Sequence, residues 1–166
     1  MTALINQTIQ TGLNKQVVEE FSASAQYTAM AYYFESETLP GLAEFFHAQA
    51  DEERDHALKL LSYISEAGGQ PLVPATNEPK NHFEDAEEVV QIALNQELKV
   101  TEQINSLVDL AIKENDHLTR SFLQWFVDEQ LEEVSSMSDL LNVVRRAVKT
   151  NLLLVEDYLA RHSHEE

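Results

Sequence analysis

The sequence predicts an all-α fold: a four-helix bundle with one long crossover between its second and third helices and a short fifth helix at the C-terminus. Gly and Pro are scarce, at four each, and neither occurs between Lys80 and Glu166. That stretch is therefore expected to be helical, interrupted only by polar turns. Seam residues also recur at alternating three- and four-residue spacings over four long segments, which is typical of helices packed nearly parallel.

The first half of the chain contains two predicted helices, at about residues 5–36 and 42–67, on either side of Pro40-Gly41. Their seams are Leu13, Val17, Glu20, Ser24, Tyr27, Ala31 and Phe34, and then Phe46, Gln49, Glu53, His56, Leu60 and Tyr63. The short break between the two segments predicts an antiparallel hairpin.

The second half repeats this arrangement, with helices at about residues 84–114 and 117–147, a turn at Asn115-Asp116 and a short helix at about 152–162. Its seams are Val90, Ala93, Glu97, Val100, Ile104, Leu107 and Ala111, and then Phe122, Phe126, Glu129, Glu133, Met137, Leu140 and Val144. The two hairpins are joined by about 15 residues, which reach about 50 Å when extended, against a helix length of about 40 Å. The connection can therefore run the length of the bundle and make the third helix parallel to the second.

The composition fits one globular domain over residues 1–166 and excludes several functions. A hydrophobic fraction of 43% is enough for a full core, and the absence of Cys excludes disulfides, thiolate zinc sites and Cys nucleophiles. The 29 acidic and 11 basic residues give a charge of −18, which disfavours binding to nucleic acid or to an anionic membrane. With neither a membrane-spanning apolar window nor a leader pattern, we expect a soluble cytoplasmic protein.

Ionisable residues interrupt every seam about halfway along its helix. They are Glu20 on the first helix, Glu53 and His56 on the second, Glu97 on the third, and Glu129 and Glu133, with Gln130 and Glu132 beside them, on the fourth. An unpaired buried carboxylate costs several kcal/mol, and no Lys or Arg occupies a seam position. A bound divalent cation would pair these charges, and one carboxylate per helix together with Glu-x-x-His is the di-iron carboxylate pattern.

The positions of these residues along the bundle axis agree well in the second hairpin and less well in the first. Glu97 and Glu133 lie at similar distances from the turn at Asp116. Counted from Pro40, Glu20 and the Glu53–His56 pair differ by about 4–7 residues, up to about 10 Å of helical rise. We expect an asymmetric turn or a helix tilt to absorb the difference.

These motifs resemble those of bacterial non-haem ferritins over nearly the whole chain. The resemblance rests on Glu20 to Tyr27 (EFSASAQY), Glu52 to His56 (EERDH), Gln96-Glu97 and Phe122 to Glu133 (FLQWFVDEQLEE).

The resemblance implies a ferroxidase centre that oxidises Fe(II) with O2 or H2O2, and a homo-oligomeric shell of 24 chains that stores the Fe(III) as a mineral. It implies the following sites: Glu20, Glu53 and His56 for one iron; bridging Glu53, Glu97 and Glu133, with Gln130 close by, for the second; and Glu52, Glu129, Glu132 and Glu133 for a third. Tyr27 matches a tyrosine that can supply an electron, and Trp125 matches a nearby aromatic residue that could do the same.

The sequence departs from the motifs of related protein families at several positions, and these differences narrow the class of protein to which it can belong. The fourth helix carries Gln130-x-x-Glu133 in place of a second Glu-x-x-His, which argues against bacterioferritins and di-iron oxygenases. Arg54 stands where a bacterioferritin has its haem-ligating Met, so no haem is expected. Arg120 and Leu123 stand where animal ferritins have an acidic threefold pore, which argues against iron entry by that route.

Two other functions compete with iron storage. The same centre could belong to a di-iron oxidase or peroxide-scavenging enzyme without storage, which would hold about two irons per chain in a small oligomer. The bundle could also be a non-catalytic structural subunit with vestigial carboxylates, although its ligand set is complete.

Overall fold

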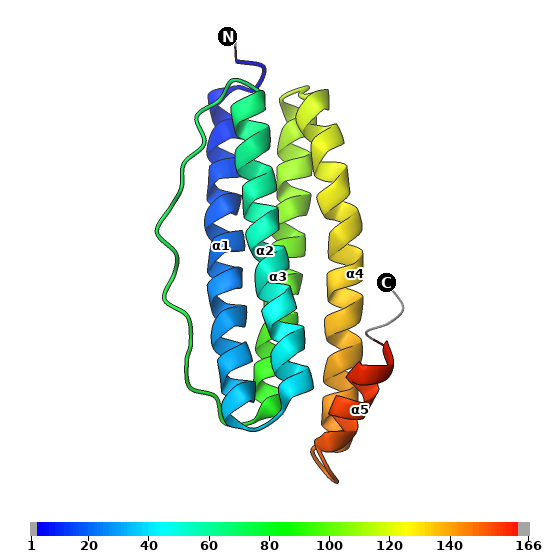
Figure 1. The fold of residues 1–166 in the computed structure, drawn as a ribbon. Coiled ribbons are helices and arrows are strands. Elements are labelled where there is room, and N and C mark those ends of the chain that lie inside the picture. The colour runs from blue at the N-terminus through cyan, green and yellow to red at the C-terminus, as the bar shows by residue number, and fades with distance from the viewer. Residues whose placement is uncertain (1–2, 163–166) are drawn as a thin grey trace.

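The computed structural model describes residues 3–162 and confirms the predicted bundle (Figure 1). The helices are α1 (Gln7–Ser36), α2 (Pro40–Glu66), α3 (Ala86–Lys113), α4 (His117–Ala147) and α5 (Leu153–His162). Every boundary lies within two residues of its expected position. The crossover runs along the outside of α1 from one end of the bundle to the other, so α3 is parallel to α2 (Figure 1).

Polar caps explain where three of the long helices begin. The side chains of Asn6, Asp85 and Asp116 each accept a hydrogen bond from the backbone N–H three residues further on, at the starts of α1, α3 and α4. Such caps satisfy donors that the first helical turn leaves free. The turns within the two hairpins contain Thr38 and Asn115, which have positive φ angles of 61° and 55°.

The start of α2 is capped from a distant part of the chain. Its N-cap residue, Leu39, makes no side-chain cap, and Pro40 occupies the first turn. The carboxylate of Glu156 on α5 instead accepts hydrogen bonds from the N–H groups of Gly41, at 2.5 Å, and Leu42, at 3.0 Å. This contact ties α5 to the positive end of α2.

Side chains of α1 hold the crossover against the bundle. The amide of Asn14 donates to the carbonyl of Gln70, at 3.0 Å, and accepts from the N–H of Leu72, at 2.8 Å. Further along, the amide of Gln26 donates to the carbonyl of Lys80 and accepts from its N–H. These bonds satisfy backbone groups of a segment that has no regular structure of its own.

The apolar core is divided into two clusters. The lower cluster, near the α1–α2 turn in Figure 1, is formed by Ala23, Tyr27, Met30, Ala31, Phe34, Leu39, Leu42, Ala43, Phe46, Ala50, Ala86, Val89, Val90, Ala93, Met137, Leu140, Leu141, Val144, Ala147 and Val155. The upper cluster, near the α3–α4 turn, is formed by Ile5, Ile9, Leu13, Val17, Ala57, Leu60, Ile64, Ala67, Val100, Ile104, Leu107, Ala111, Leu123 and Phe126. On every long helix, the predicted ionisable positions fall between the two.

The seam of α4 is rotated slightly from its predicted position. Phe122 and Glu129, expected on the seam, are only half-buried, whereas Leu123 and Gln130 beside them are buried. The alternating spacing fixes a helix face only to within about one residue, because one residue turns the helix by about 100°. The fourth helix therefore directs Gln130 and Glu133 into the bundle centre.

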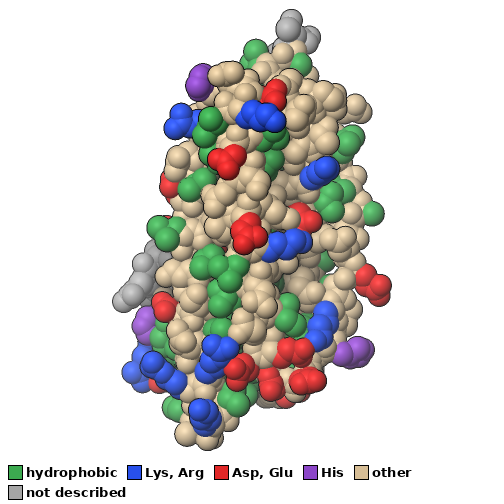
Figure 2. All heavy atoms as spheres, turned by 180° about the vertical axis from the view of Figure 1, so that it is seen from behind, with side chains coloured by type: hydrophobic (Ala, Val, Ile, Leu, Met, Phe, Trp, Pro, Cys, Tyr) green, Lys and Arg blue, Asp and Glu red, His purple; other side chains and the backbone are tan. Residues whose placement is uncertain are grey.

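The outer surface carries charged side chains of both signs. On the face seen in Figure 2, acidic and basic side chains are interspersed, and hydrophobic side chains occur in small separate groups. Within residues 3–162, no helix is both long enough and apolar enough to cross a bilayer.

Candidate metal centre

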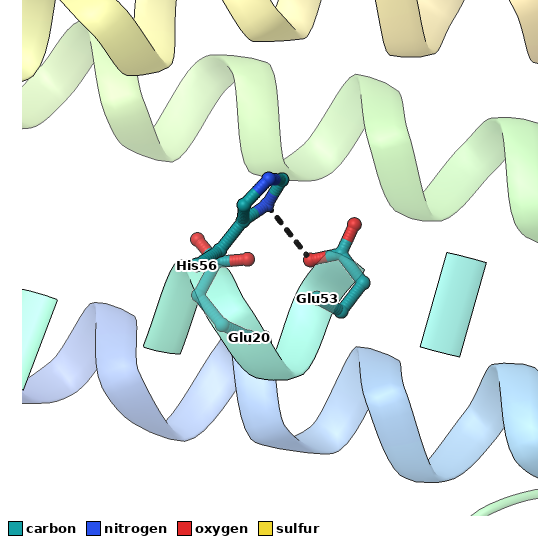
Figure 3. Close-up of side chains that lie close together, drawn as sticks. All are labelled: Glu20, Glu53 and His56. Atoms are coloured by element: carbon teal, nitrogen blue, oxygen red, sulfur yellow. Dashed lines mark ion pairs between the residues drawn. The ribbon is translucent and has the colours of Figure 1, made fainter. Parts of the chain in front are cut away.

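Glu20, Glu53 and His56 meet in the middle of the bundle (Figure 3). All three are buried, and each offers a ligand atom within 4.8 Å of the others. His56 Nδ1 lies 3.5 Å from Glu53 Oε2. The predicted height mismatch shrinks because residues 37–39 form a non-helical turn. Glu20 lies 16 residues before the end of α1 at Ser36, and Glu53 and His56 lie 13 and 16 residues after the start of α2 at Pro40.

Glu97 on α3 belongs to no such group of ligand atoms among the residues described, but its charge is near enough to raise the pKa of Glu53. It is fully buried, and the phenol of Tyr27 on α1 donates a hydrogen bond to its Oε1. Gln130 on α4 is buried, and its carbonyl oxygen accepts a hydrogen bond from the hydroxyl of Thr101 on α3, at 2.9 Å. This hydrogen bond fixes which way the Gln130 amide is turned.

Several oxygens of the centre have no hydrogen-bond partner. Glu20 Oε2, both oxygens of Glu53 and Glu97 Oε2 are buried and unsatisfied. Within residues 3–162, no Lys or Arg forms an ion pair with these carboxylates. Buried polar atoms are almost always bonded in native proteins, and unpaired carboxylates are especially costly. A cation that takes oxygen and imidazole ligands fits these vacant lone pairs.

Burial and mutual repulsion raise the pKa values of the carboxyl groups. The pKa values of Glu20 and Glu53 lie well above the ordinary value, mainly because of desolvation and then because of neighbouring carboxylates. Desolvation raises the pKa of Glu97 to about 7 and, together with the charge of Glu97, that of Glu133 to about 8. A bound cation would reverse this effect by favouring the charged forms.

A second group capable of holding a metal adjoins the first and shares His56. It comprises His56, Glu129 and Glu133, whose ligand atoms also lie within 4.8 Å of one another. Glu52 is near enough for its charge to raise the pKa of Glu133 further. Glu132 is exposed and belongs to neither group among the residues described. The structure thus groups two of the four residues expected at the third site, Glu129 and Glu133, and adds His56 to them.

Two glutamines at the centre were not predicted as site residues. Gln16 is buried, and its amide donates to Glu20 Oε1 at 2.8 Å. Gln49 donates to Glu52 Oε2 at 2.5 Å and leaves its own oxygen buried and unpaired. Each lies one helical turn before an expected ligand, at a spacing of four residues from Glu20 or Glu53. That spacing places both amides on the ligand face and was the available signal.

Comparisons with known proteins agree on one family. A family model for the ferritin-like domain matches residues 10–147. The ferritin BfrB of Mycolicibacterium smegmatis is 42% identical over 149 residues, covering 90% of this chain and 82% of that one. A bacterial non-haem ferritin of Staphylococcus saprophyticus is 36% identical over 165 residues, covering 98% and 99%.

Solved structures give the same result. An open-pore ferritin from the archaeon Archaeoglobus fulgidus superimposes with a TM-score of 0.90 at 33% identity, covering 93% of this chain and 97% of that one. This chain belongs to the ferritin family. The resemblance to bacterial non-haem ferritins found in the sequence is confirmed.

Proposed function

We propose that this protein is an iron-storage ferritin: it oxidises Fe(II) inside the bundle with O2 or H2O2 and stores the Fe(III) as a mineral in a closed shell. The observation that carries the proposal is the set of buried, unpartnered carboxylate oxygens on Glu20, Glu53 and Glu97, next to His56. Such a set is costly for a structural bundle and well suited to iron, which binds carboxylate and imidazole in both oxidation states.

The proposed ligands divide among three irons. The first iron would bind Glu20, Glu53 and His56; the second would bind Glu53 as a bridge, Glu97 and Glu133, with Gln130 beside them; the third would bind Glu52, Glu129, Glu132 and Glu133. Carboxylates stabilise Fe(III) over Fe(II), so the centre favours oxidation. Tyr27, whose phenol donates a hydrogen bond to Glu97, would supply an electron and leave its proton on that carboxylate. No haem is part of this proposal.

Storage requires more than one chain, because a filled four-helix core has no room for a mineral. We propose that residues 1–166 form one domain and that 24 copies assemble into the shell, in the cytoplasm. The net charge of −18 is consistent with an inner wall that attracts cations.

Iron loading distinguishes storage from its main alternative. The metal-free protein is given excess Fe(II) in air, freed of unbound metal and sized by gel filtration, and the iron per chain is measured. Storage predicts tens of irons per chain in a large shell. About two irons per chain in a small oligomer would instead favour a di-iron oxidase or peroxide scavenger.

Substitution of a ligand tests the proposed centre itself. His56→Ala, Glu20→Ala and Glu53→Ala should each slow Fe(II) oxidation sharply, by about tenfold or more, because even loss of a residue that only supports a metal ligand typically costs about 10–100-fold. His47→Ala is the matched control, since His47 lies on the same helix but is paired with Glu35 at the surface. Unchanged oxidation in His56→Ala would overturn the assignment and favour a structural bundle.

A further inference from the structure

A continuous chain of aromatic rings leads from His56 toward the upper end of the bundle. The His56 ring contacts Trp125 and Phe126, with ring centres 5.3 and 5.8 Å apart. Phe126 contacts Phe122 at 5.6 Å, and Phe122 stacks face to face on Tyr63 at 3.9 Å and 7°. The first three contacts lie within the range of ordinary aromatic pairs, and the Phe122–Tyr63 contact is closer still.

The outer end of the chain has a route for a proton. The hydroxyl of Thr119 donates to Asp116 Oδ2 at 2.6 Å, which uses its one hydrogen. The phenol of Tyr63, 2.8 Å from the same hydroxyl, must therefore donate to it. The resulting relay runs from Tyr63 through Thr119 to Asp116. Asp116 in turn lines an open hollow of about 410 Å³, so a proton that reaches it can pass to solvent.

A nearby positive charge affects which of the aromatic residues would hold the radical that forms when an electron is lost. Lys59 Nζ lies 4.0 Å above the centre of the Trp125 ring. Such a cation stabilises the neutral indole but opposes a positively charged indole radical. Among residues 3–162 no cation lies over the Tyr63 ring, and Tyr63 can lose its proton along the relay as it loses an electron. The radical would therefore be more stable on Tyr63 than on Trp125.

We propose that Tyr63 is the terminal electron donor of a redox chain serving the metal centre, a role that rests on the proposed oxidation of Fe(II). Reduction of hydrogen peroxide to two waters takes two electrons and two protons. When the centre holds a single Fe(II), the iron supplies one electron. Tyr63 supplies the other through Phe122 and Phe126, becoming a neutral tyrosyl radical. Its proton goes to Asp116 through Thr119, and solvent supplies one proton for each electron at the centre.

This donor would protect the bundle in a particular circumstance. A lone Fe(II) that gives one electron to peroxide releases a hydroxyl radical, which attacks nearby side chains. A second electron from Tyr63 completes the reduction to water and moves the oxidising equivalent to the upper end of the bundle, where Tyr63 is half-buried.

The test uses the metal-free assembly loaded with one Fe(II) per chain and mixed with hydrogen peroxide. Samples are frozen rapidly for electron paramagnetic resonance, with ring-deuterated tyrosine to identify a tyrosyl signal, and a spin trap reports hydroxyl radical. The comparison is made in a Tyr27→Phe background, which removes the tyrosine that donates to Glu97. In that background we expect Tyr63→Phe to lose the tyrosyl signal and to release more hydroxyl radical. Thr119→Val should weaken the signal with Tyr63 still present, because the proton relay is cut.

Matched variants make the result specific. Tyr158→Phe is the control, because the Tyr158 ring stacks on His162 of α5 and lies outside the chain of rings. Lys59→Met should shift part of the signal from tyrosyl to tryptophanyl. A tyrosyl signal that survives Tyr63→Phe in the Tyr27→Phe background, or no radical in a wild-type protein that oxidises its iron, would overturn this inference alone. A wild-type protein that leaves Fe(II) unoxidised would overturn the proposed function instead.

Discussion

The two ends of the bundle and its middle are built from the same four helices but on opposite principles. The lower and upper clusters are entirely apolar apart from the Tyr27 phenol. Between them lies the carboxylate layer, defined here as Glu20, Glu53, His56, Glu97, Gln130 and Glu133, which are all buried. The helical spacing is unbroken through this layer, so the change affects residue chemistry and leaves the packing geometry intact.

The comparison teaches that stability and the candidate site are separated along the helix axis. Burial of apolar side chains supplies most of the free energy of folding. The carboxylate layer opposes folding whenever its members are charged without a cation, as their raised pKa values indicate. The free energy gained by burying the apolar clusters at the two ends must therefore offset the cost of the carboxylate layer between them.

The largest expected effect comes from weakening either end. Phe46, fully buried and stacked on Phe34 at 5.5 Å, belongs to the lower cluster, and Leu123 is its buried counterpart in the upper one. Phe46→Ala should lower the free energy of unfolding by about 3–5 kcal/mol, and Leu123→Ala by about 2–5 kcal/mol. Both substitutions remove buried apolar atoms and leave a cavity that the surroundings fill only in part. Urea unfolding of the metal-free protein, followed by circular dichroism, measures both.

An intermediate effect on stability comes from titrating the carboxylate layer. The unfolded chain releases the protons of Glu97 and Glu133 near their ordinary pKa of 4.5, whereas the folded protein keeps them until about 7 and about 8. The unfolded state thus binds fewer protons between these values, so the stability of the metal-free protein should fall as pH rises from about 4.5 to 8. Glu97 alone would account for on the order of 3 kcal/mol.

Amide substitutions test the origin of this slope. Glu97→Gln and Glu133→Gln replace a carboxyl group by a neutral side chain of the same shape, so each should flatten the decline and raise stability at pH 8. Glu44→Gln, at an exposed position of α2, is the control and should leave the profile unchanged. A profile that rises between pH 4.5 and 8 would contradict the assigned direction of these pKa shifts. Excess Fe(II), kept anaerobic, should reverse the loss by pairing the charges.

Most of the fold could be predicted from the sequence because its signals are local. The absence of Gly and Pro after Pro79, the three-four spacing and the cap residues Asn6, Asp85 and Asp116 all act within a few residues. The rotation of the α4 seam and the cap that Glu156 places on α2 could not be predicted in this way. Both depend on contacts between helices that lie far apart in the sequence.

The candidate site could be predicted to the level of which helices contribute, but not of which atoms face which. Repeated charges at seam positions identified Glu20, Glu53, His56 and Glu97. The supporting amides were missed because a glutamine on a helix face carries no charge that would need explanation. The orientation of Gln130 likewise depends on Thr101, one turn beyond Glu97 on α3, and no spacing rule reports a rotation of a terminal amide.

The smallest expected effect lies where α5 joins the lower end of the bundle. Glu156→Ala removes the acceptor for the N–H groups of Gly41 and Leu42, and α2 has no cap of its own to replace it. Loss of such a cap costs about 1 kcal/mol, and the lost charge at the positive end of the helix contributes to it. Hydrogen exchange should therefore speed up in the first turn of α2 and throughout α5.

Glu156→Gln keeps an acceptor oxygen without the charge, so it should fall between the wild type and Glu156→Ala. Asp157→Ala is the matched control: Asp157 lies next in sequence but pairs with Arg161 on α5 itself, so exchange in α2 should stay as in the wild type. If Glu156→Ala leaves exchange in α5 unchanged, the contact is dispensable. The buried side chain of Val155, with Leu159 also packed against the lower cluster, would then be what holds this helix in place.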